Sequence, residues 1–482
     1  MSGLALLHEN GAFRSALLVA GLLLVGLVAG GVVALVTPAY VAAGMVGVVA
    51  ALVLISSPQA SLLALLAVAT LLPFAAIPLP IGFVPTFLDV VLITFFVGWL
   101  ARLVNRSDDH LVATPLTGPL LAFMGLAVVS LVMSQGLNQS IARYFVEMLL
   151  AMALFFGVVN AVRQRRQVDM LVWALIIGAA LAASVGIVLY YLPRDTSVYL
   201  LSTLRVLNYP AGSGVLRFLN DDPAQAMRAI ATSIDPNVLG GLLMVASGLA
   251  VPQLFRDGSL RRRAALLAAL GVMGWCLLLT LSRGSWVGLA ASVAFIATLK
   301  YRRMWLLIIV VAAGVFVLPE AEAYVAHLLS GIQMQDKAAA MRLGEYTDAL
   351  KLIARYPLLG IGFGSSPTID LYLGVSNVYL LIAEETGLLG LGAYLLTLAT
   401  LFQQGMRRLV NCRDPRLQAT LAGLLAALSA ACTAGILDHY FFNLVFPHMA
   451  ALFWMLAGLV MVVVRLPDEA PGASPAGANE NA

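Results

Sequence analysis

Apolar stretches of about 20 residues recur along almost the whole chain, and they constrain its fold more than any other feature. The run from Ser15 to Val36 contains no charged residue, and an α-helix of that length spans the hydrocarbon core of a bilayer. In lipid, every backbone N–H and C=O group must be paired within a helix or a closed barrel. The runs are long and continuous instead of short and alternating, so the sequence predicts an all-α polytopic membrane protein.

The composition of the 482 residues agrees with this class. Hydrophobic residues make up 61% of the chain and charged residues 11%, whereas soluble domains contain roughly 25% charged residues. A chain this long and this apolar cannot bury its surface in one aqueous core. The first apolar run follows Arg14, as in a signal peptide, but its length and the further runs behind it favour an uncleaved helix.

Short Lys/Arg-rich segments separate the apolar runs and predict the orientation of the chain. They are Arg102–Arg106, Arg163–Arg166, Arg256–Arg263, Lys300–Arg303 and Arg407–Arg416. The positive-inside rule places such segments in the cytoplasm, and both termini with them. The net charge of +4 follows from this orientation bias, so it gives no reason to expect nucleic acid as a partner.

About 14 transmembrane helices satisfy the hydropathy and charge pattern. The predicted spans are 15–36, 39–56, 59–78, 86–104, 113–134, 141–161, 168–192, 236–255, 264–281, 285–299, 304–318, 376–402, 417–436 and 446–465. They form a single integral membrane domain over residues 1–465. Residues 466–482 are rich in Pro, Ala, Gly and Asn and are predicted to be a disordered cytoplasmic tail. The three cysteines show no disulfide or metal-ligand spacing.

Two long connections, Pro193–Asp235 and Pro319–Gly374, fall on the predicted periplasmic side. They contain arginines, which are disfavoured there: Arg194, Arg205, Arg217, Arg228, Arg342 and Arg355. Arg283 lies at the same predicted interface, between two apolar helices. Guanidinium groups bind phosphate as a bidentate fork, so outer arginines indicate an anion site. For the loop arginines, the alternative is ordinary pairing with loop carboxylates.

The second connection contains a predicted helix followed by a glycine-rich exit. Over Arg342–Ala354, helical periodicity predicts one apolar face made of Leu343, Tyr346, Leu350 and Ile353, and Pro357 ends the helix. The segment GIGFGSS follows. Its glycines either let the backbone approach a sugar or a phosphate, or they form a plain turn.

Polar residues interrupt the helices that follow. Ser376 is a predicted helix cap, and Asn377 and Tyr379 lie in the first turn behind it. Glu384 and Glu385 lie about two turns further, at lipid depth, where a carboxylate needs a partner or a cavity. We expect at least one of them to pair with an inward-facing arginine.

The connection LDHYFFN between the last two helices is unusually polar, since it contains Asp438, His439, Tyr440 and Asn443. His439 has the side chain best suited to act as a base near neutral pH. Alternatively, it belongs to an aromatic belt at the membrane interface, beside Tyr440 and Phe441. His327 and His448 are weaker candidates.

Taken in order, these segments resemble the O-antigen ligase and O-antigen polymerase superfamily (Wzy/WaaL type). Four pieces between Arg228 and Leu391 carry the resemblance. They are Arg228 followed by SIDPNVLGGLL, the Ser-Arg-Gly segment LSRGSWVGL, the loop helix with its exit RLGEYTDALKLIARYPLLGIGFGS, and the next helix SNVYLLIAEETGLLGL. Each piece alone is a weak signal, but the order and the shared side of the membrane make the set specific.

The resemblance implies a glycosyltransferase of GT-C-like architecture that needs neither a metal nor another cofactor. Such enzymes lie in the bacterial inner membrane and act at its periplasmic face, where they transfer a glycan from undecaprenyl diphosphate to a hydroxyl group. Arginines would stabilise the diphosphate charge in place of Mg²⁺, and the motif match assigns this role to Arg228 and Arg283. Residues expected to contact the substrate are Arg217, Arg342, Asn237, Ser376, Asn377 and Tyr379. Membrane lipid is an expected partner, and binding of a chain-length regulator or a flippase is left open.

The chain departs from the ligase members at one position. Those members have His directly before the Asn of an HN-x-x-L motif, proposed as the base, and this chain has Ser376 there. A serine hydroxyl is not an unassisted base near neutral pH, so Asp370, Glu385 and His439 are the candidate replacements. If none of them serves, the reaction relies on positioning and on stabilisation of the leaving group.

Three functions follow from these features. A polymerase that extends a lipid-linked polysaccharide is favoured, because Ser376 weakens the match to the ligases. A ligase that transfers the glycan to lipid A core is the alternative within the same chemistry. A transporter or flippase is the third, but transporters concentrate ionisable groups at the membrane midplane, whereas the charges here gather in outer loops and at helix ends.

Overall fold

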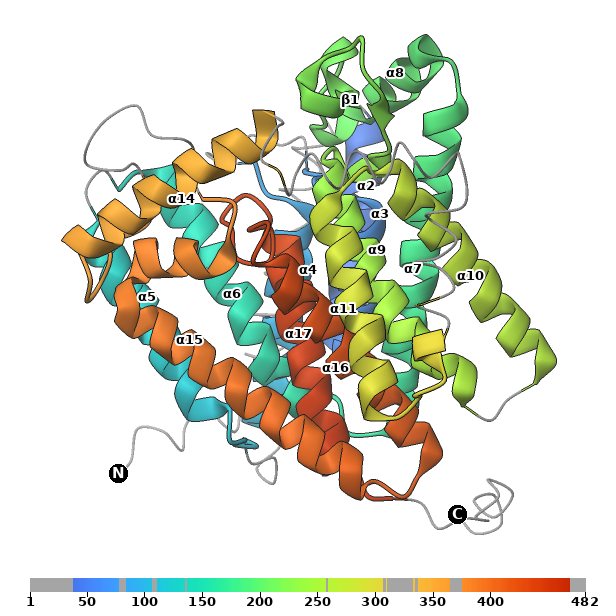
Figure 1. The fold of residues 1–482 in the computed structure, drawn as a ribbon, viewed down its shortest axis with the longest axis vertical. Coiled ribbons are helices and arrows are strands. Elements are labelled where there is room, and N and C mark those ends of the chain that lie inside the picture. The colour runs from blue at the N-terminus through green and yellow to red at the C-terminus, as the bar shows by residue number, and fades with distance from the viewer. Residues whose placement is uncertain are drawn as a thin grey trace, which may run out of the picture.

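The computed structural model describes residues 38–77, 84–105, 111–134, 137–256, 259–306, 309, 333, 337–364 and 375–468. Helices dominate this part of the chain (Figure 1). They are α2 (Pro38–Ser56), α3 (Pro58–Leu71), α4 (Phe87–Asn105), α5 (Thr117–Met133), α6 (Gln139–Ala161), α7 (Arg165–Tyr191), α8 (Arg194–Thr203), α9 (Pro236–Ala250), α10 (Leu260–Leu279), α11 (Arg283–Leu299), α14 (Lys337–Arg355), α15 (Val378–Asn411), α16 (Pro415–Ala434) and α17 (Pro447–Arg465).

The helical membrane class is confirmed in the described residues. Eight helices are long and apolar enough to cross a membrane, and four shorter apolar helices accompany them. Each of these coincides with a predicted span. The span 15–36 lies outside the described residues, and so does the span 304–318 apart from residues 304–306 and 309. The total of about 14 spans and the GT-C-like architecture stay predictions.

The long connection between α7 and α9 is folded. It holds α8, four short 3₁₀ turns and two strands of two residues each, β1 (Arg217–Phe218) and β2 (Met227–Arg228), which pair antiparallel. The 3₁₀ turns are η2 (Leu204–Leu207), η3 (Ser213–Val215), η4 (Leu219–Asp221) and η5 (Ala231–Ser233), and η6 (Val251–Phe255) extends α9. In Figure 1, α8 and β1 lie at the top of the view, above the bundle.

The centre of the bundle is formed by α9, α16 and α17, which are the most buried of the candidate spans. α6 packs against α17, while α11 packs against both α9 and α16. The sequences of α9 and α16 are rich in Gly, Ala and Ser, and such small residues let helices approach closely in a membrane. This core joins the two ends of the bundle, where the charged residues lie.

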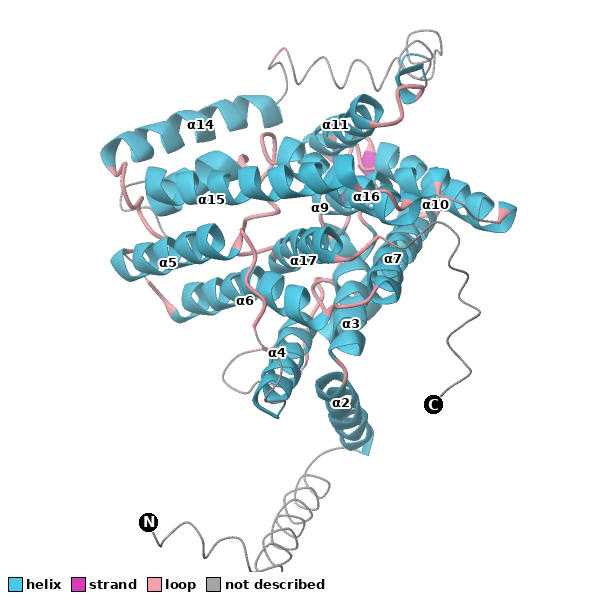
Figure 2. Ribbon diagram, turned by 90° about the horizontal axis from the view of Figure 1, so that it is seen from below, coloured by secondary structure: helices cyan, strands magenta, loops and turns pink. Residues whose placement is uncertain are grey.

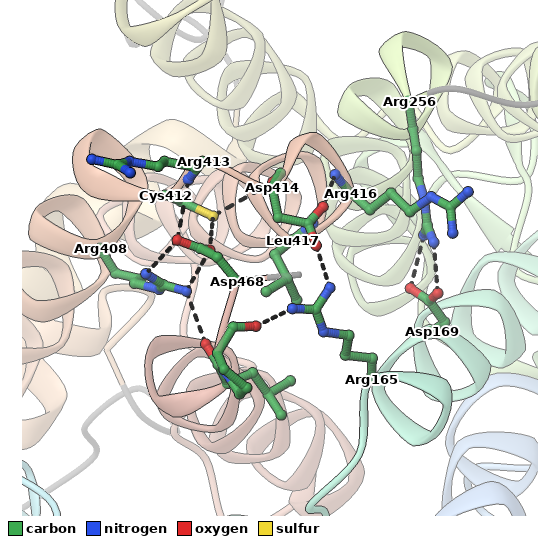
Figure 3. A network of polar contacts seen from close by, with 12 residues as sticks. Arg165, Asp169, Arg256, Arg408, Cys412, Arg413, Asp414, Arg416, Leu417 and Asp468 are labelled. Carbon is green, nitrogen blue, oxygen red and sulfur yellow. Dashed lines mark hydrogen bonds and ion pairs between the residues drawn. The ribbon is translucent and has the colours of Figure 1, made fainter. Parts of the chain in front are cut away.

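The loops that were predicted to share a side of the membrane do share an end of the bundle. At the basic end, Arg165 pairs with Asp414, Arg256 with Asp169, and Arg408 with Asp468 (Figure 3). At the other end, the α3–α4 connection bonds to the α8–β1 segment, through the Ala76 N–H and the Leu207 carbonyl at 2.9 Å. Which end faces the periplasm stays a prediction from the positive-inside rule.

The first residues of the predicted tail are held in place. The Arg408 guanidinium lies 2.7 Å from the Asp468 carboxylate, and Arg165 also donates to the Pro467 carbonyl. Residues beyond Asp468 lie outside the described part of the chain.

The glycine-rich exit of α14 fits into a break in α15. α15 leaves the helical conformation at Gly387, where φ is 72°. There the Leu388 N–H bonds the Pro357 carbonyl at 2.7 Å, and the Ile361 N–H bonds the Glu384 carbonyl at 2.9 Å. A Cβ on Gly360 would lie 2.4 Å from that carbonyl oxygen. The close approach that these glycines permit is therefore to the α15 backbone, which satisfies groups that the break leaves open.

α14 forms as predicted and ends just before Pro357, and its predicted apolar face is covered only in part. It lies beside α15 at the edge of the bundle (Figure 2). Ala349 and Leu352 are buried there, whereas Leu343 and Leu350 are 52% and 56% exposed. Tyr346, from the same predicted face, packs against the core of the bundle. The position of the neighbouring helices therefore decides which part of the apolar face is covered.

Candidate active site

The end of the bundle opposite the basic end is called the outer end, after its predicted orientation. There, Arg228 is held by two neutral groups from different elements. Its Nε donates to the Thr280 carbonyl at 2.8 Å, and its Nη2 donates to the Asn237 side-chain oxygen at 2.7 Å. Asn237 is placed by Asp235, the cap of α9, whose carboxylate accepts from the Asn237 N–H at 2.7 Å. The Nη1 of Arg228 has no hydrogen-bond partner among the described residues, so part of its fork is left for a ligand.

Two strained residues flank this arrangement. Ile234 has φ 60° directly before Asp235, and Leu281 has φ 53° directly before the Ser282 cap of α11. A side chain with a Cβ in this region costs about 1–3 kcal/mol. Such strain persists only where the surrounding structure imposes it, and it is enriched at active sites. Ile234 leads into α9, which carries Asn237, the partner of Arg228, and Leu281 leads into α11, which begins with Arg283.

Several of the predicted arginines lie close together at the outer end of the bundle. Arg283 starts α11 and lies close enough to Arg228 for the two charges to repel. Arg217 stands directly opposite Arg228 in the β1–β2 pair, and like charges opposite each other destabilise a ribbon. The structure thus brings together three of the predicted arginines. Their mutual repulsion is the kind of cost that a bound anion would relieve.

A second group of residues approaches from α14 and from the turn between α16 and α17. Asp438 lies within electrostatic range of Arg342 and Arg228. The His439 Nδ1 lies 3.8 Å from the Asp438 carboxylate and makes no hydrogen bond in the described part of the chain. The imidazole is mostly buried, with 19% of its side chain exposed. Asp438 therefore links His439 and Arg342 to the arginine cluster.

Ser376 lies beside this group. Its N–H donates to the Glu345 carboxylate at 2.9 Å, and its carbonyl accepts from the Tyr346 hydroxyl at 3.1 Å. The same hydroxyl lies 3.1 Å from the carbonyl of Ile436, three residues before His439. Tyr346 thus ties the position where the ligases have their histidine to the turn that carries His439 here.

Asn377 and Tyr379 hold the start of α15 against the end of α16. Asn377 caps α15 through its side-chain oxygen and donates to the Ile436 carbonyl at 2.9 Å. The Tyr379 hydroxyl donates to the Cys432 carbonyl at 2.8 Å. These bonds fix the start of α15 against the end of α16, so the structure gives both residues a positioning role, and their predicted contact with substrate stays a prediction.

Glu384 and Glu385 lie at the break in α15, and the structure does not bring them to the arginines. Glu385 lies within electrostatic range of Glu384, and Glu384 within that of Asp348. Neither carboxylate forms an ion pair within the described residues, so the expected pairing with an arginine is wrong. Asp370 and His327 lie outside the described residues.

Burial makes the charges at this end costly. It lowers the pKa of the Arg228 guanidinium, against the opposing effect of Asp235 and Asp438. It also raises the pKa of the Asp438 carboxyl, although His439 and Arg342 act in the opposite direction. Arginine stays protonated even so. A site that keeps charges in spite of such costs is a candidate functional site.

Two important residues were not predicted as site members. Asp235 was part of a quoted motif, and its position directly before Pro236 is a typical N-cap signal. Asp438 was noted only as part of a polar turn. No sequence signal places Asp438 beside Arg228, since the two are more than 200 residues apart along the chain.

Part of the chain is similar to a known protein family. Residues 268–395 match the O-antigen ligase family model. The match confirms the resemblance and supports an enzyme of the ligase or polymerase type. No curated protein matches the chain.

The O-antigen ligase match covers only part of the candidate active site. It includes Arg283, Arg342 and Ser376, whereas Arg228 and His439 lie outside it on either side. The fold therefore completes the matched segment with residues from the α8–β2 region and from the last interhelical turn.

Proposed function

We propose that this chain is a polysaccharide polymerase that transfers an undecaprenyl-diphosphate-linked glycan to a growing lipid-linked chain at the periplasmic face of the bacterial inner membrane. The observation that carries the proposal is the grouping of Arg228, Arg342 and His439 near Asp438, with Arg283 beside Arg228. The match to the O-antigen ligase family supports the reaction class.

In the proposed reaction, an acceptor hydroxyl attacks the anomeric carbon of the donor glycan. The bond from that carbon to the diphosphate breaks, and the diphosphate leaves with the electron pair. Arg228 and Arg283 stabilise the charge that develops on it. Because Arg228 is fixed by Thr280 and Asn237, its guanidinium needs little reorganisation as the charge forms.

The proton of the acceptor hydroxyl goes to His439 in this proposal. The imidazole is the titratable side chain best matched to neutral pH, and Asp438 lies on its Nδ1 side, where a carboxylate stabilises an imidazolium. His439 takes the role that the ligases give to the residue at the Ser376 position. This relocation of the base favours a polymerase over a ligase with lipid A core as acceptor.

Purified protein in liposomes tests the proposal. Lipid-linked oligosaccharide would be supplied alone, and then together with lipid A core. Chain growth without the second acceptor is expected for a polymerase, whereas transfer that requires lipid A core would make the chain a ligase. His439→Ala should reduce transfer by about 10²-fold or more at neutral pH, as loss of a general base does. No transfer with either acceptor would refute the proposed enzyme activity.

A further inference from the structure

The basic end of the bundle contains a pocket of about 300 Å³. It lies between the start of α7, the end of η6 and the start of α16, at the end opposite the candidate active site. Four arginines line it, and the remaining lining residues include one carboxylate. The arginines are Arg165, Arg166, Arg256 and Arg416, and the carboxylate is Asp169.

Only two of these arginines are used in ion pairs. Arg256 binds Asp169 through both terminal nitrogens, at 2.8 and 2.7 Å, and Arg165 pairs with Asp414. Arg166 and Arg416 form no ion pair in the described part of the chain and stand exposed at the rim. The pocket therefore carries more positive charge than the protein itself balances.

The buried side chains at the bottom of the pocket also carry more positive charge than the protein balances. Arg256 is only 7% exposed, and its Nε has no hydrogen-bond partner among the described residues. Figure 3 shows the Arg416 side chain reaching toward Arg256, and Arg262 lies close enough to both for their charges to repel. Cations crowded around a cavity are costly unless an anion is bound there.

Two helix N-termini add to the positive potential. α7 begins at Arg165 and α16 at Pro415, and the start of a helix attracts anions through its dipole. Side chains cap both helix starts, since Asp414 accepts from the first N–H groups of α16 and Gln164 forms a capping box with Gln167 at the start of α7. The helix ends therefore only reinforce the arginines, which remain the main source of charge.

We propose that this pocket binds a phosphate group. Arginine forks match phosphate oxygens in geometry and charge, and the pocket volume fits a headgroup. The phosphate has two possible sources, an anionic phospholipid of the adjoining leaflet or a soluble phosphate compound. Basic pockets between transmembrane helices recognise lipid headgroups by this chemistry.

An occupant would link helices that reach the opposite end. α9 begins beside Asp235 and continues through η6 to Arg256, and α16 begins beside Arg416 and ends shortly before Asp438. A phosphate that bridges Arg256 and Arg416 would bind only the folded protein, so it would raise the thermal stability of the bundle.

The test measures thermal unfolding of the full chain in a neutral detergent during titration with three probes. These are inorganic phosphate, short-chain phosphatidylglycerol, and diacylglycerol of the same chain length, which lacks the phosphate. We expect phosphatidylglycerol to raise the midpoint, and diacylglycerol to have no effect. A rise with inorganic phosphate as well would assign the site to phosphate itself, and a rise with the phospholipid alone would assign it to a lipid headgroup.

Variants at the pocket rim make the test specific. Arg166→Gln and Arg416→Gln should each weaken binding about tenfold, as loss of one charge-assisted hydrogen bond does. Both side chains are exposed, so the unliganded midpoint should stay that of wild type. Arg407→Gln and Arg413→Gln are matched controls, since both arginines are exposed at the same end outside the pocket. Equal loss in the controls, or an equal effect of diacylglycerol, would overturn the proposal.

Discussion

Arginines gather at both ends of the bundle, but their partners differ. At the basic end, Arg165, Arg256 and Arg408 pair with aspartates that lie on other elements. At the outer end, Arg228 is held by a carbonyl and an amide. An ion pair uses the charge of an arginine to join elements, whereas neutral acceptors fix its position and leave the charge for a ligand. The same residue type thus serves the scaffold at one end and, we propose, the chemistry at the other.

Replacement of Arg228 should show the largest contrast between the two ends. Arg228→Ala is expected to lower glycan transfer by about 10²–10³-fold, the usual effect of removing one preorganised donor. Transfer in liposomes is the measurement. Arg228→Lys should recover only part of the rate, because it restores the charge without the fork.

Arg194→Ala is the matched control for Arg228. Arg194 lies in the same outer segment, and its described contacts are a 3.4 Å bond to the Pro223 carbonyl and a position over the Phe218 ring. We expect near wild-type transfer in this variant. An equal loss in both variants would show that outer arginines act only through general charge.

Arg256→Ala tests the structural role of the basic end. Its ion pair with Asp169 is buried on the arginine side, but 35% of the Asp169 side chain is exposed. Truncation of Arg256 should therefore lower the free energy of unfolding by roughly 2 kcal/mol, which is less than the loss expected for a fully buried ion pair. Unfolding in detergent measures this, and transfer per folded molecule should stay unchanged. If transfer instead falls as it does in Arg228→Ala, the assignment of a structural role to the basic end and a catalytic role to the outer end is wrong.

Asn237→Ala tests whether a neutral partner positions Arg228. Loss of the 2.7 Å bond to Nη2 should reduce transfer about tenfold, as expected for a hydrogen bond to a charged group. Asn237→Asp keeps an oxygen acceptor but pairs its charge with that of Arg228, so the rate should stay low although an acceptor is present. Equal rates in wild type and Asn237→Ala would remove the positioning role, and a wild-type rate in Asn237→Asp would show that the partner of Arg228 need not be neutral.

The smallest effect is expected for the stability of Asp438→Asn. Burial raises the pKa of Asp438, so the folded state binds its proton more tightly than the unfolded state does. The stability linked to this group is therefore full below the ordinary carboxyl pKa and is lost as pH rises through the folded value. At pH 7, Asp438→Asn should unfold at or above the wild-type midpoint, with the difference vanishing in acid. A clearly lower midpoint at pH 7 would show that the ionised carboxylate stabilises the fold.

Hydropathy and loop charge predicted most of the scaffold. Lipid leaves a backbone few alternatives to a helix, so the predicted spans met by the described residues coincide with helices. Local rules also predicted α14 and its end near Pro357. They could not predict how much of the apolar face of α14 is covered, because periodicity shows that a stripe is apolar and does not show which neighbour covers it.

The sequence by itself determined the membrane class, the grouping of loops at two ends and the arginines that matter as candidates. The tertiary structure alone decided that Arg228 lies against Thr280 and Asn237, and that Asp438 and His439 approach from the last interhelical turn. It also separated the carboxylates at the break in α15 from the arginines. The physical reason is that hydropathy acts on each segment independently, whereas an active site depends on how helices far apart in the chain pack together.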